Sequence, residues 1–264
     1  MTAAIAENTV NQMDALELLR ALPEASVDAV ITDPPYSSGA FNETARRQSS
    51  GQGLRSETIR RDGWFNNDNM GTAGMVWLMR ALACEASSVL VDGGSLLVFC
   101  DWRMVINLAP AMESSGLRYQ NMIVWNKNGA GLGTGFRPQH ELIMHFVKGT
   151  GRFYALTGTN VITTARVRPD DKDHPTEKPF TLMTKLIEVV TDVGGLVVDP
   201  FMGSGKTLRA ARALNRRYIG GDTNPDYVEL VRRKLRDDYT PQLFPEADAV
   251  DDAPRQVEMF EATP

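Results

Sequence analysis

The sequence predicts an α/β protein whose core is a doubly wound, mostly parallel β-sheet. Short apolar runs typical of buried strands alternate along the chain with longer segments whose apolar residues recur at helical spacing. Two of the apolar runs end in turns rich in proline or glycine, after residues 32 and 198. Strands that alternate with helices in this way favour parallel pairing through helical crossovers.

In the first half of the chain, a helix is predicted over 11–22 because Met13, Leu16 and Leu19 have helical spacing. The apolar run that follows is typical of a buried parallel strand. Two prolines end this run, since proline cannot extend a sheet ladder. The later elements of this half follow from the same two patterns. In chain order they are the strand 27–32, the helix 75–90, the strand 95–100, the helix 104–115 and the strand 119–125.

The second half begins with an apolar strand predicted over 141–147. A helix is expected over 180–191, with Leu182, Leu186 and Val190 at helical spacing and Pro179 in the first turn, where proline is tolerated. Short apolar runs and amphipathic segments then alternate again. In chain order they are the strand 196–198, the helix 208–214, the strand 217–221 and the helix 226–236.

Three connections are too polar or too rich in glycine for regular structure. Residues 37–74 form a long polar stretch, and a loop of this length in a compact domain is usually functional or disordered. Its local positive charge suits phosphate contacts, and a merely solvated loop is the alternative. The arginines that would contact DNA are Arg46, Arg47, Arg55, Arg60 and Arg61. Residues 126–135, rich in glycine, suit a close approach to a ligand or a DNA backbone, and residues 149–173 are irregular.

Composition excludes few classes of protein. The formal net charge of -5 gives no global basic field, although a local basic stripe would suffice for nucleic-acid binding. Both cysteines, Cys84 and Cys100, lie in apolar stretches, which suits reduced thiols in a cytoplasmic protein. The histidines have no metal-site spacing. We expect no signal peptide and no membrane span.

Four residues follow the first buried strand: Asp33, Pro34, Pro35 and Tyr36. They are expected at the carboxyl end of a parallel strand, where ligands bind in open α/β sheets. The Asp33 carboxylate and the Pro34 carbonyl are two acceptors beside the flat ring of Tyr36. This combination suits a planar ring that carries an amino group. The alternative is a strand-ending turn with aspartate as a local cap.

A second candidate site is the glycine turn after residue 198. Gly203 and Gly205 allow the backbone to pass close to a nucleoside cofactor, and Asp222 stands at the end of the next strand, where an acidic residue can hold ribose hydroxyls. A phosphate loop is a weaker interpretation because Pro200 occupies the position of its first glycine. In a doubly wound sheet, we expect this turn beside Asp33, on the same edge of an adjacent strand.

Taken together, the motifs resemble those of the beta group of DNA amino-methyltransferases. They are Asp-Pro-Pro-Tyr at 33–36, His-Pro-Thr-Glu-Lys-Pro at 174–179, Asp-Pro-Phe-Met-Gly-Ser-Gly at 199–205 and an acidic strand end at 222. The resemblance covers about residues 14–236. It implies a seven-stranded, Rossmann-like methyltransferase fold in circularly permuted motif order. It also implies S-adenosyl-L-methionine as the cofactor and the exocyclic nitrogen of adenine or cytosine in DNA as the target, as in restriction-modification systems.

The resemblance assigns roles to matching positions. Asp33, Pro34, Pro35 and Tyr36 would form the catalytic site that holds the target base. Asp14 would lie near the cofactor adenine, and Thr176 and Lys178 would hold its methionine end. The full cofactor-binding set is Asp14, Asp33, Thr176, Lys178, Asp199, Phe201, Gly203, Ser204, Gly205 and Asp222. Lys206 departs from the family, where threonine is commoner after the second glycine.

Adenine N6 is the favoured target, because in this family an aspartate that opens the tetrapeptide is commoner for adenine. The alternatives are cytosine N4, an RNA amino-methyltransferase and a non-catalytic DNA-binding module of the same fold. Methylation of a cytosine carbon is rejected because it needs an activated thiolate. Neither cysteine lies in a polar, activating stretch of sequence.

We expect a single methyltransferase domain over residues 1–240, with DNA-contacting insertions near 37–74 and 149–173, and an acidic, disordered tail over 241–264. The expected partner is double-stranded DNA whose target base is flipped out. We expect the protein to be cytoplasmic and encoded by a bacterium or a phage. The tail segment 256–260, Gln-Val-Glu-Met-Phe, resembles peptides that dock on the bacterial sliding clamp; chance is the alternative. The oligomeric state stays open, with a homodimer among the options.

Overall fold

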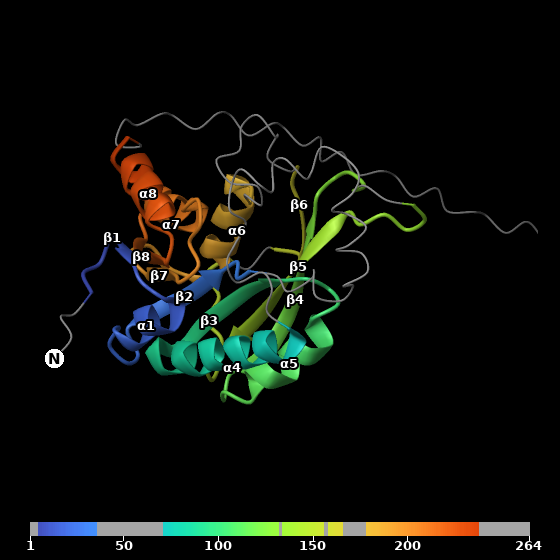
Figure 1. The fold of residues 1–264 in the computed structure, drawn as a ribbon, viewed down its shortest axis with the longest axis horizontal. Helices are drawn as coiled ribbons and strands as arrows, with labels where there is room; N and C mark the ends of the chain where they lie inside the picture. The colour runs from blue at the N-terminus through green and yellow to red at the C-terminus, as the bar shows by residue number, and fades with distance from the viewer. Residues whose placement is uncertain (1–4, 36–70, 132–133, 156–157, 166–177, 238–264) are drawn as a thin grey trace, which may run out of the picture.

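The computed structural model describes residues 5–35, 71–131, 134–155, 158–165 and 178–237. Within these ranges the chain forms one eight-stranded sheet in the order β1-β8-β7-β2-β3-β5-β4-β6 (Figure 1). The strands are β1 (Thr9–Gln12), β2 (Val27–Thr32), β3 (Leu90–Cys100), β4 (Arg118–Asn126), β5 (His140–Val147), β6 (Val161–Thr163), β7 (Leu196–Asp199) and β8 (Arg217–Asp222). The helices are α1 (Ala15–Arg20), α4 (Thr72–Val89), α5 (Val105–Glu113), α6 (Phe180–Val190), α7 (Lys206–Ala213) and α8 (Pro225–Asp237).

The pairing of the strands decides where functional residues can meet. The neighbours β1, β8, β7, β2 and β3 pair in parallel, whereas β5 is antiparallel to both β3 and β4. Because two antiparallel steps restore the direction, β4 runs the same way as β2. The carboxyl ends of β2, β3, β4, β7 and β8 therefore lie on one edge of the sheet, which we call the carboxyl edge. The predicted doubly wound, mostly parallel α/β fold is confirmed.

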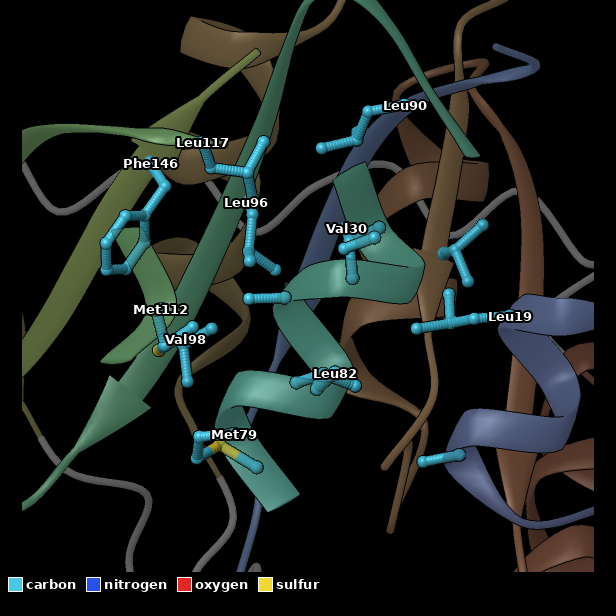
Figure 2. Packing of buried hydrophobic residues seen from close by; sticks show 14 of the residues in the cluster. Leu19, Val30, Met79, Leu82, Leu90, Leu96, Val98, Met112, Leu117 and Phe146 are labelled. Atoms are coloured by element: carbon cyan, nitrogen blue, oxygen red, sulfur yellow. The ribbon is translucent and has the colours of Figure 1, made fainter. Parts of the chain in front are cut away.

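Helices cover both faces of the sheet because strand residues alternate between the two faces. On one face, α1, α4 and α5 pack on inward-facing residues such as Val30, Leu96 and Val98. Figure 2 shows Met79 and Leu82 of α4 against these strand side chains. On the other face, α6, α7 and α8 cover residues such as Ile31, Leu97 and Phe99. Each fully buried aliphatic side chain contributes about 1.5–3 kcal/mol, so the two cores fix the positions of the strand ends.

The structure corrects three details of the predicted elements. Residues 9–12 form β1 at the edge of the sheet, paired with β8 from Thr9 to Gln12, and the helix begins only at Ala15. The strand β3 begins at Leu90, five residues before the predicted start of the strand at residue 95. The short strand β6 pairs with β4 inside the stretch 149–173 predicted as irregular. Strand β6 raises the number of strands in the described residues above the seven that the resemblance implied.

No helix in the described part of the chain is long and apolar enough to span a bilayer. The division into a single domain over 1–240 and an acidic tail stays a prediction, since residues 238–264 and the core of the first insertion, 36–70, lie outside the described residues.

Candidate active site

Two sequence motifs that lie far apart in the chain meet at the carboxyl edge. Asp33 directly follows β2, and Asp199 ends β7. Strands β2 and β7 pair in parallel through Ala29 with Val197 and Val30 with Val198, so both motifs leave neighbouring strands in the same direction. The expectation that the tetrapeptide and the glycine turn share one edge of adjacent strands is therefore confirmed for the described residues.

The two carboxylate oxygens of Asp33 have different surroundings. Oδ2 accepts a hydrogen bond from Lys178 Nζ at 2.5 Å. Oδ1 is buried and accepts no hydrogen bond among the residues that the structure describes. A buried acceptor without a donor costs about 1–3 kcal/mol, and such groups are uncommon in folded proteins. Oδ1 therefore offers a buried, directional acceptor for a ligand that brings its own N–H or O–H group.

Lys178 joins Asp33 to a second carboxylate. Its side chain is almost fully buried, and Nζ lies 3.2 Å from Glu141 Oε2 and 5.0 Å from the centre of the Phe99 ring. The other Glu141 oxygen, Oε1, is paired with Lys127. Two cations and two carboxylates thus alternate in the order Lys127, Glu141, Lys178 and Asp33, and their formal charges cancel. We call these four side chains the ion-pair chain.

The pKa values of Lys178 and Glu141, the two inner members of the ion-pair chain, are shifted so that both side chains favour their charged forms. Burial would lower the pKa of Lys178, but the carboxylates of Asp33 and Glu141 raise it above its usual value. Burial would likewise raise the pKa of Glu141, but Lys178 and Lys127 hold it below its usual value. Both groups are therefore ionised at neutral pH, and Lys178 supplies a fixed positive charge to Asp33.

The ion-pair chain adds two residues that the sequence did not single out. Glu141 is the second residue of the largely apolar strand β5, and Lys127 directly follows β4. A carboxylate at the start of an otherwise apolar strand was the available signal for Glu141. The expected role of Lys178 at the methionine end of the cofactor stays a prediction, and the structure adds a direct contact between Lys178 and Asp33.

The carboxylate of Asp199 is held by three donors from the protein itself. It accepts hydrogen bonds from Thr32 Oγ1 at 2.9 Å, from Thr207 Oγ1 at 2.5 Å and from Phe201 N at 3.1 Å. Burial raises its pKa to about 7, although these hydrogen bonds lower it. These contacts tie β2, the glycine turn and α7 together. Asp199 therefore positions the turn, and direct cofactor binding by its side chain stays a prediction.

Two glycines in the turn have left-handed backbone conformations, with φ of +47° at Gly203 and +76° at Gly205. A Cβ atom on Gly205 would lie 2.6 Å from Val231 Cγ1 of α8, so this position needs glycine for packing as well as for φ. A Cβ atom on Gly203 would meet no described atom within 4 Å. The turn therefore leaves open space beside Gly203.

Asp222 borders this open space. Its Oδ2 accepts a hydrogen bond from Gly203 N at 3.2 Å, and its Oδ1 accepts one from Asn224 N at 2.8 Å. Asp222 is partly exposed, and burial of its carboxyl group raises its pKa. The Thr223 backbone also donates to this carboxylate, and its roughly four lone-pair sites leave room for a ligand hydroxyl.

The other predicted cofactor residues lie around the same edge. Asp14 follows β1 and caps α1 through Leu16 N at 2.9 Å, while the neighbouring Met13 N donates to Asp222 O. Asp14 is exposed, beside the end of β8. Phe201 is partly buried and Ser204 is buried. Pro34 is buried and Pro35 is partly buried directly after β2.

Several predicted residues lie outside the described residues. They are Tyr36, Thr176, the five arginines at 46, 47, 55, 60 and 61, and the segment 256–260. Their roles stay predictions.

Thiol and metal chemistry find no support in the described part of the chain. Burial raises the pKa of Cys100 to about 12, so this thiol is protonated at neutral pH. Cys84 is the other cysteine, and both are free thiols. No group of three histidine, cysteine, aspartate or glutamate side chains in the described residues could hold a metal ion. His145 is buried against Ser95 Oγ at 3.0 Å, and burial lowers its pKa to about 4.

Comparison with known proteins finds similar sequences and similar folds. The chain is 25% identical over 251 residues to the type II methyltransferase M.HpaI of Haemophilus parainfluenzae, covering 86% of this chain and 73% of that protein. The crystal structure of the M1.HpyAVI-SAM complex matches with a TM-score of 0.60 and 22% identity, covering 86% of this chain and 99% of that one. The PvuII DNA methyltransferase, which is named as cytosine-N4-specific, matches with a TM-score of 0.67 and 18% identity, covering 87% and 86%.

A family profile covers most of the chain. The profile N6_N4_Mtase, described as DNA methylase, matches residues 27–233. This range includes Asp33, the ion-pair chain, the glycine turn and Asp222. The chain therefore belongs to the DNA methylase family of amino-methyltransferases directed to N6 or N4.

Proposed function

We propose that this chain is an S-adenosyl-L-methionine-dependent DNA methyltransferase that moves a methyl group to the exocyclic N6 of adenine in duplex DNA. The observation that most directly supports this proposal is Asp33 Oδ1, a buried acceptor without a donor among the described residues. It lies at the carboxyl edge next to the glycine turn. Membership of the DNA methylase family supports the reaction class, and the M1.HpyAVI-SAM complex supports the cofactor.

The ends of β7 and β8 fit a nucleoside cofactor. Gly203 leaves open space in which a ligand could approach the backbone, and Asp222 borders it with lone pairs available for ribose hydroxyls. When bound, S-adenosyl-L-methionine supplies an electrophilic methyl group on its sulfonium. The residues that would hold it are Asp14, Phe201, Gly203, Ser204, Gly205 and Asp222.

The part of Asp33 is to orient the amine of the target base. An exocyclic amine is a poor nucleophile because its lone pair is delocalised into the ring. Hydrogen bonds from the amine to Asp33 Oδ1 and to the Pro34 carbonyl would draw its two hydrogens toward a tetrahedral arrangement and localise that lone pair. Lys178 donates a hydrogen bond to Oδ2 and so holds the orientation of Asp33, which leaves Oδ1 as the acceptor for the amine. The released proton passes to water after transfer.

A base within duplex DNA must leave the stack before Asp33 can reach its amine. Tyr36 is proposed to stack on the extruded base. Adenine is proposed over cytosine on the resemblance of an aspartate-led tetrapeptide to adenine-directed members, and the same two acceptors would also serve the N4 amine of cytosine.

Transfer of tritium from methyl-labelled cofactor to duplex DNA tests the proposal. After digestion to deoxynucleosides, we expect the label in N6-methyldeoxyadenosine, and label in N4-methyldeoxycytidine would replace the proposed base with the alternative. The Asp33→Ala variant should lose at least about 100-fold in transfer rate, because an oriented acceptor is removed. Asp192→Ala is a matched control, since Asp192 lies on an exposed turn between α6 and β7, at the opposite edge.

Cofactor binding separates this mechanism from simple unfolding. Equilibrium dialysis with labelled cofactor should show that Asp33→Ala still binds it, because Asp222 and the glycine turn are unchanged. Undiminished methyl transfer by Asp33→Ala would sink the proposed mechanism.

A further inference from the structure

The connection between β4 and β5 extends the antiparallel pair beyond the carboxyl edge (Figure 1). Lys127 N donates to Gln139 O at 2.9 Å, and Gly131 N donates to Pro138 O at 2.7 Å. These bonds continue the ladder past Asn126 and His140. We call residues 127–131 and 134–139 the edge hairpin, and these bonds order its base.

The base of the edge hairpin is fixed relative to Asp33. Asn126 Oδ1 accepts hydrogen bonds from Asn128 N at 3.1 Å and from Gln139 Nε2 at 3.0 Å. Lys127, the first residue of the hairpin, is also the first member of the ion-pair chain that ends at Asp33. The base of the edge hairpin is thus tied through three ion pairs to the side chain that carries Oδ1.

The far end of the edge hairpin presents an aromatic ring to solvent. Phe136 is fully exposed, with 109% of its reference accessible area, and Arg137 beside it is also exposed. Gly135, directly before the ring, has a φ of +69°. A phenylalanine that contacts so little of its own protein contributes nothing to the core, so its ring is available to a partner.

The charge of the edge hairpin favours a polyanion as that partner. Residues 126–140 include no aspartate or glutamate, in a chain of formal net charge -5. Of their two cations, Lys127 is paired with Glu141, and Arg137 is exposed. The same edge of the sheet also bears Trp102, which is mostly exposed, with the Arg103 guanidinium 5.3 Å from its ring centre. Exposed aromatic rings beside arginines suit stacked bases flanked by phosphates. A protein partner would instead favour a continuous apolar patch rather than a single ring on a glycine-rich hairpin.

We propose that the edge hairpin is a wedge for duplex DNA, in which Phe136 enters the base stack beside the target base and Arg137 contacts the adjacent phosphate. The ring would fill the space left by the base that moves to Asp33 and would so keep that base extruded. This inference rests on the proposed function, since it gives the hairpin a task only if a base must leave the duplex.

The kinetic test compares two substrates that differ only in pairing of the target base. Both contain the site that the wild-type protein methylates, one fully paired and the other with the target base opposite a mismatch. Phe136→Ala should lower kcat/KM on the paired duplex by roughly ten- to a hundredfold, and on the mismatched duplex by less than about threefold, because extrusion is already easy there. Phe136→Trp should retain activity, since it preserves a stacking ring.

Matched controls distinguish a wedge from general damage. Tyr154→Ala removes another exposed ring; the Tyr154 backbone N donates to Val189 O near the end of α6, toward the opposite edge of the sheet. It should leave both substrates unaffected. Equal losses on the paired and mismatched duplexes for Phe136→Ala would overturn the wedge.

A spectroscopic test does not depend on methyl transfer. In the Phe136→Trp variant, adding duplex DNA should quench tryptophan emission beyond the quenching of the wild type, because the new indole stacks on bases. Quenching without methyl transfer would support the wedge while refuting the proposed function. Methyl transfer with neither extra quenching nor a loss specific to the paired duplex would refute the wedge alone. Capture of a protein in place of DNA by the hairpin would refute it as well.

Discussion

At the scale of single residues, the two oxygens of the Asp33 carboxylate have different tasks: one forms an ion pair within the protein, and the other is available to a ligand. Its Oδ2 is bonded to Lys178 and its Oδ1 is left open. Because the same cation is shared with Glu141, neither charge in the pair is left uncompensated. This arrangement holds one oxygen of the carboxylate in place and leaves the other open to a ligand.

Replacing Lys178 separates its two proposed roles. In Lys178→Met, Asp33 and Glu141 lose their common cation, and Asp33 loses the hydrogen bond that holds the orientation of its carboxylate. We expect kcat at pH 7 to fall at least about tenfold, because Oδ1 is then no longer held toward the amine. Breaking this buried pair should also cost about 3–5 kcal/mol of unfolding free energy.

Lys127→Met is the matched control for that variant, because it removes the same charge from the ion-pair chain without touching Asp33. Its kcat should change less than that of Lys178→Met, because the hydrogen bond from Lys178 to Asp33 remains. Cofactor affinity, measured by equilibrium dialysis, tests the other role. An unchanged kcat with a weakened affinity in Lys178→Met would instead assign Lys178 to the methionine end of the cofactor.

At the scale of elements, the glycine turn between β7 and α7 has two glycines with different tasks. Both have positive φ, but only Gly205 packs so closely on α8 that a Cβ would clash with Val231. Packing against α8 thus requires glycine at 205. At 203 no neighbouring atom requires it, and the absent side chain leaves open space. Sequence spacing alone treats the two positions alike, because the difference depends on α8, which follows some twenty residues later.

Alanine substitutions should reveal this difference. Gly205→Ala should lower the unfolding free energy by about 1–3 kcal/mol, because a strained φ is combined with a steric clash. Gly203→Ala should cost about 1 kcal/mol, since it adds only the strain of a positive φ, yet it should weaken cofactor binding. Denaturant unfolding and equilibrium dialysis measure the two effects. A larger stability loss for Gly203→Ala than for Gly205→Ala would contradict this division of roles.

Elements at the ends of the sheet were the hardest to predict from sequence. The residues Thr9, Asn11 and Gln12 of β1 are polar and give no strand pattern, yet they pair with β8 through backbone hydrogen bonds. The three residues of β6 pair with β4 in the same way. Short strands at an edge are decided by the neighbouring strand that offers free backbone groups, and a local pattern does not record that neighbour. The long amphipathic helices and buried strands, by contrast, were predicted within a few residues.

At the scale of the whole molecule, two buried titrating groups oppose each other in the pH dependence of stability. The pKa of Asp199 is raised to about 7, so the folded state binds a proton that the unfolded state releases, and stability falls as the pH rises from about 4 to 7. The pKa of His145 is lowered to about 4, so stability falls as the pH drops from about 6.5 to 4. Between these limits the two effects act in opposite directions.

Removing one group should therefore expose the other. Asp199→Asn should show a fall in unfolding free energy as the pH drops from 6.5 to 4.5. His145→Gln, which can retain a hydrogen bond to Ser95, should show a fall as the pH rises from 4.5 to 7. Urea unfolding at intervals of half a pH unit measures both. If the unfolding free energies of both variants changed with pH in the same direction, the pKa of Asp199 or of His145 would not be shifted as expected.

The sequence by itself determined the fold class, because buried strands and amphipathic helices leave periodic apolar patterns, and it determined the family through motifs at Asp33, Gly203, Gly205 and Asp222. Only the tertiary structure decided how the carboxylate of Asp33 is used. Lys178 and Glu141 reach it from segments more than a hundred residues away, and the pairing of β2 with β3, of β3 with β5 and of β2 with β7 brings those segments to one edge. Local patterns encode burial and turns, whereas the partner of a buried charge depends on which strands become neighbours.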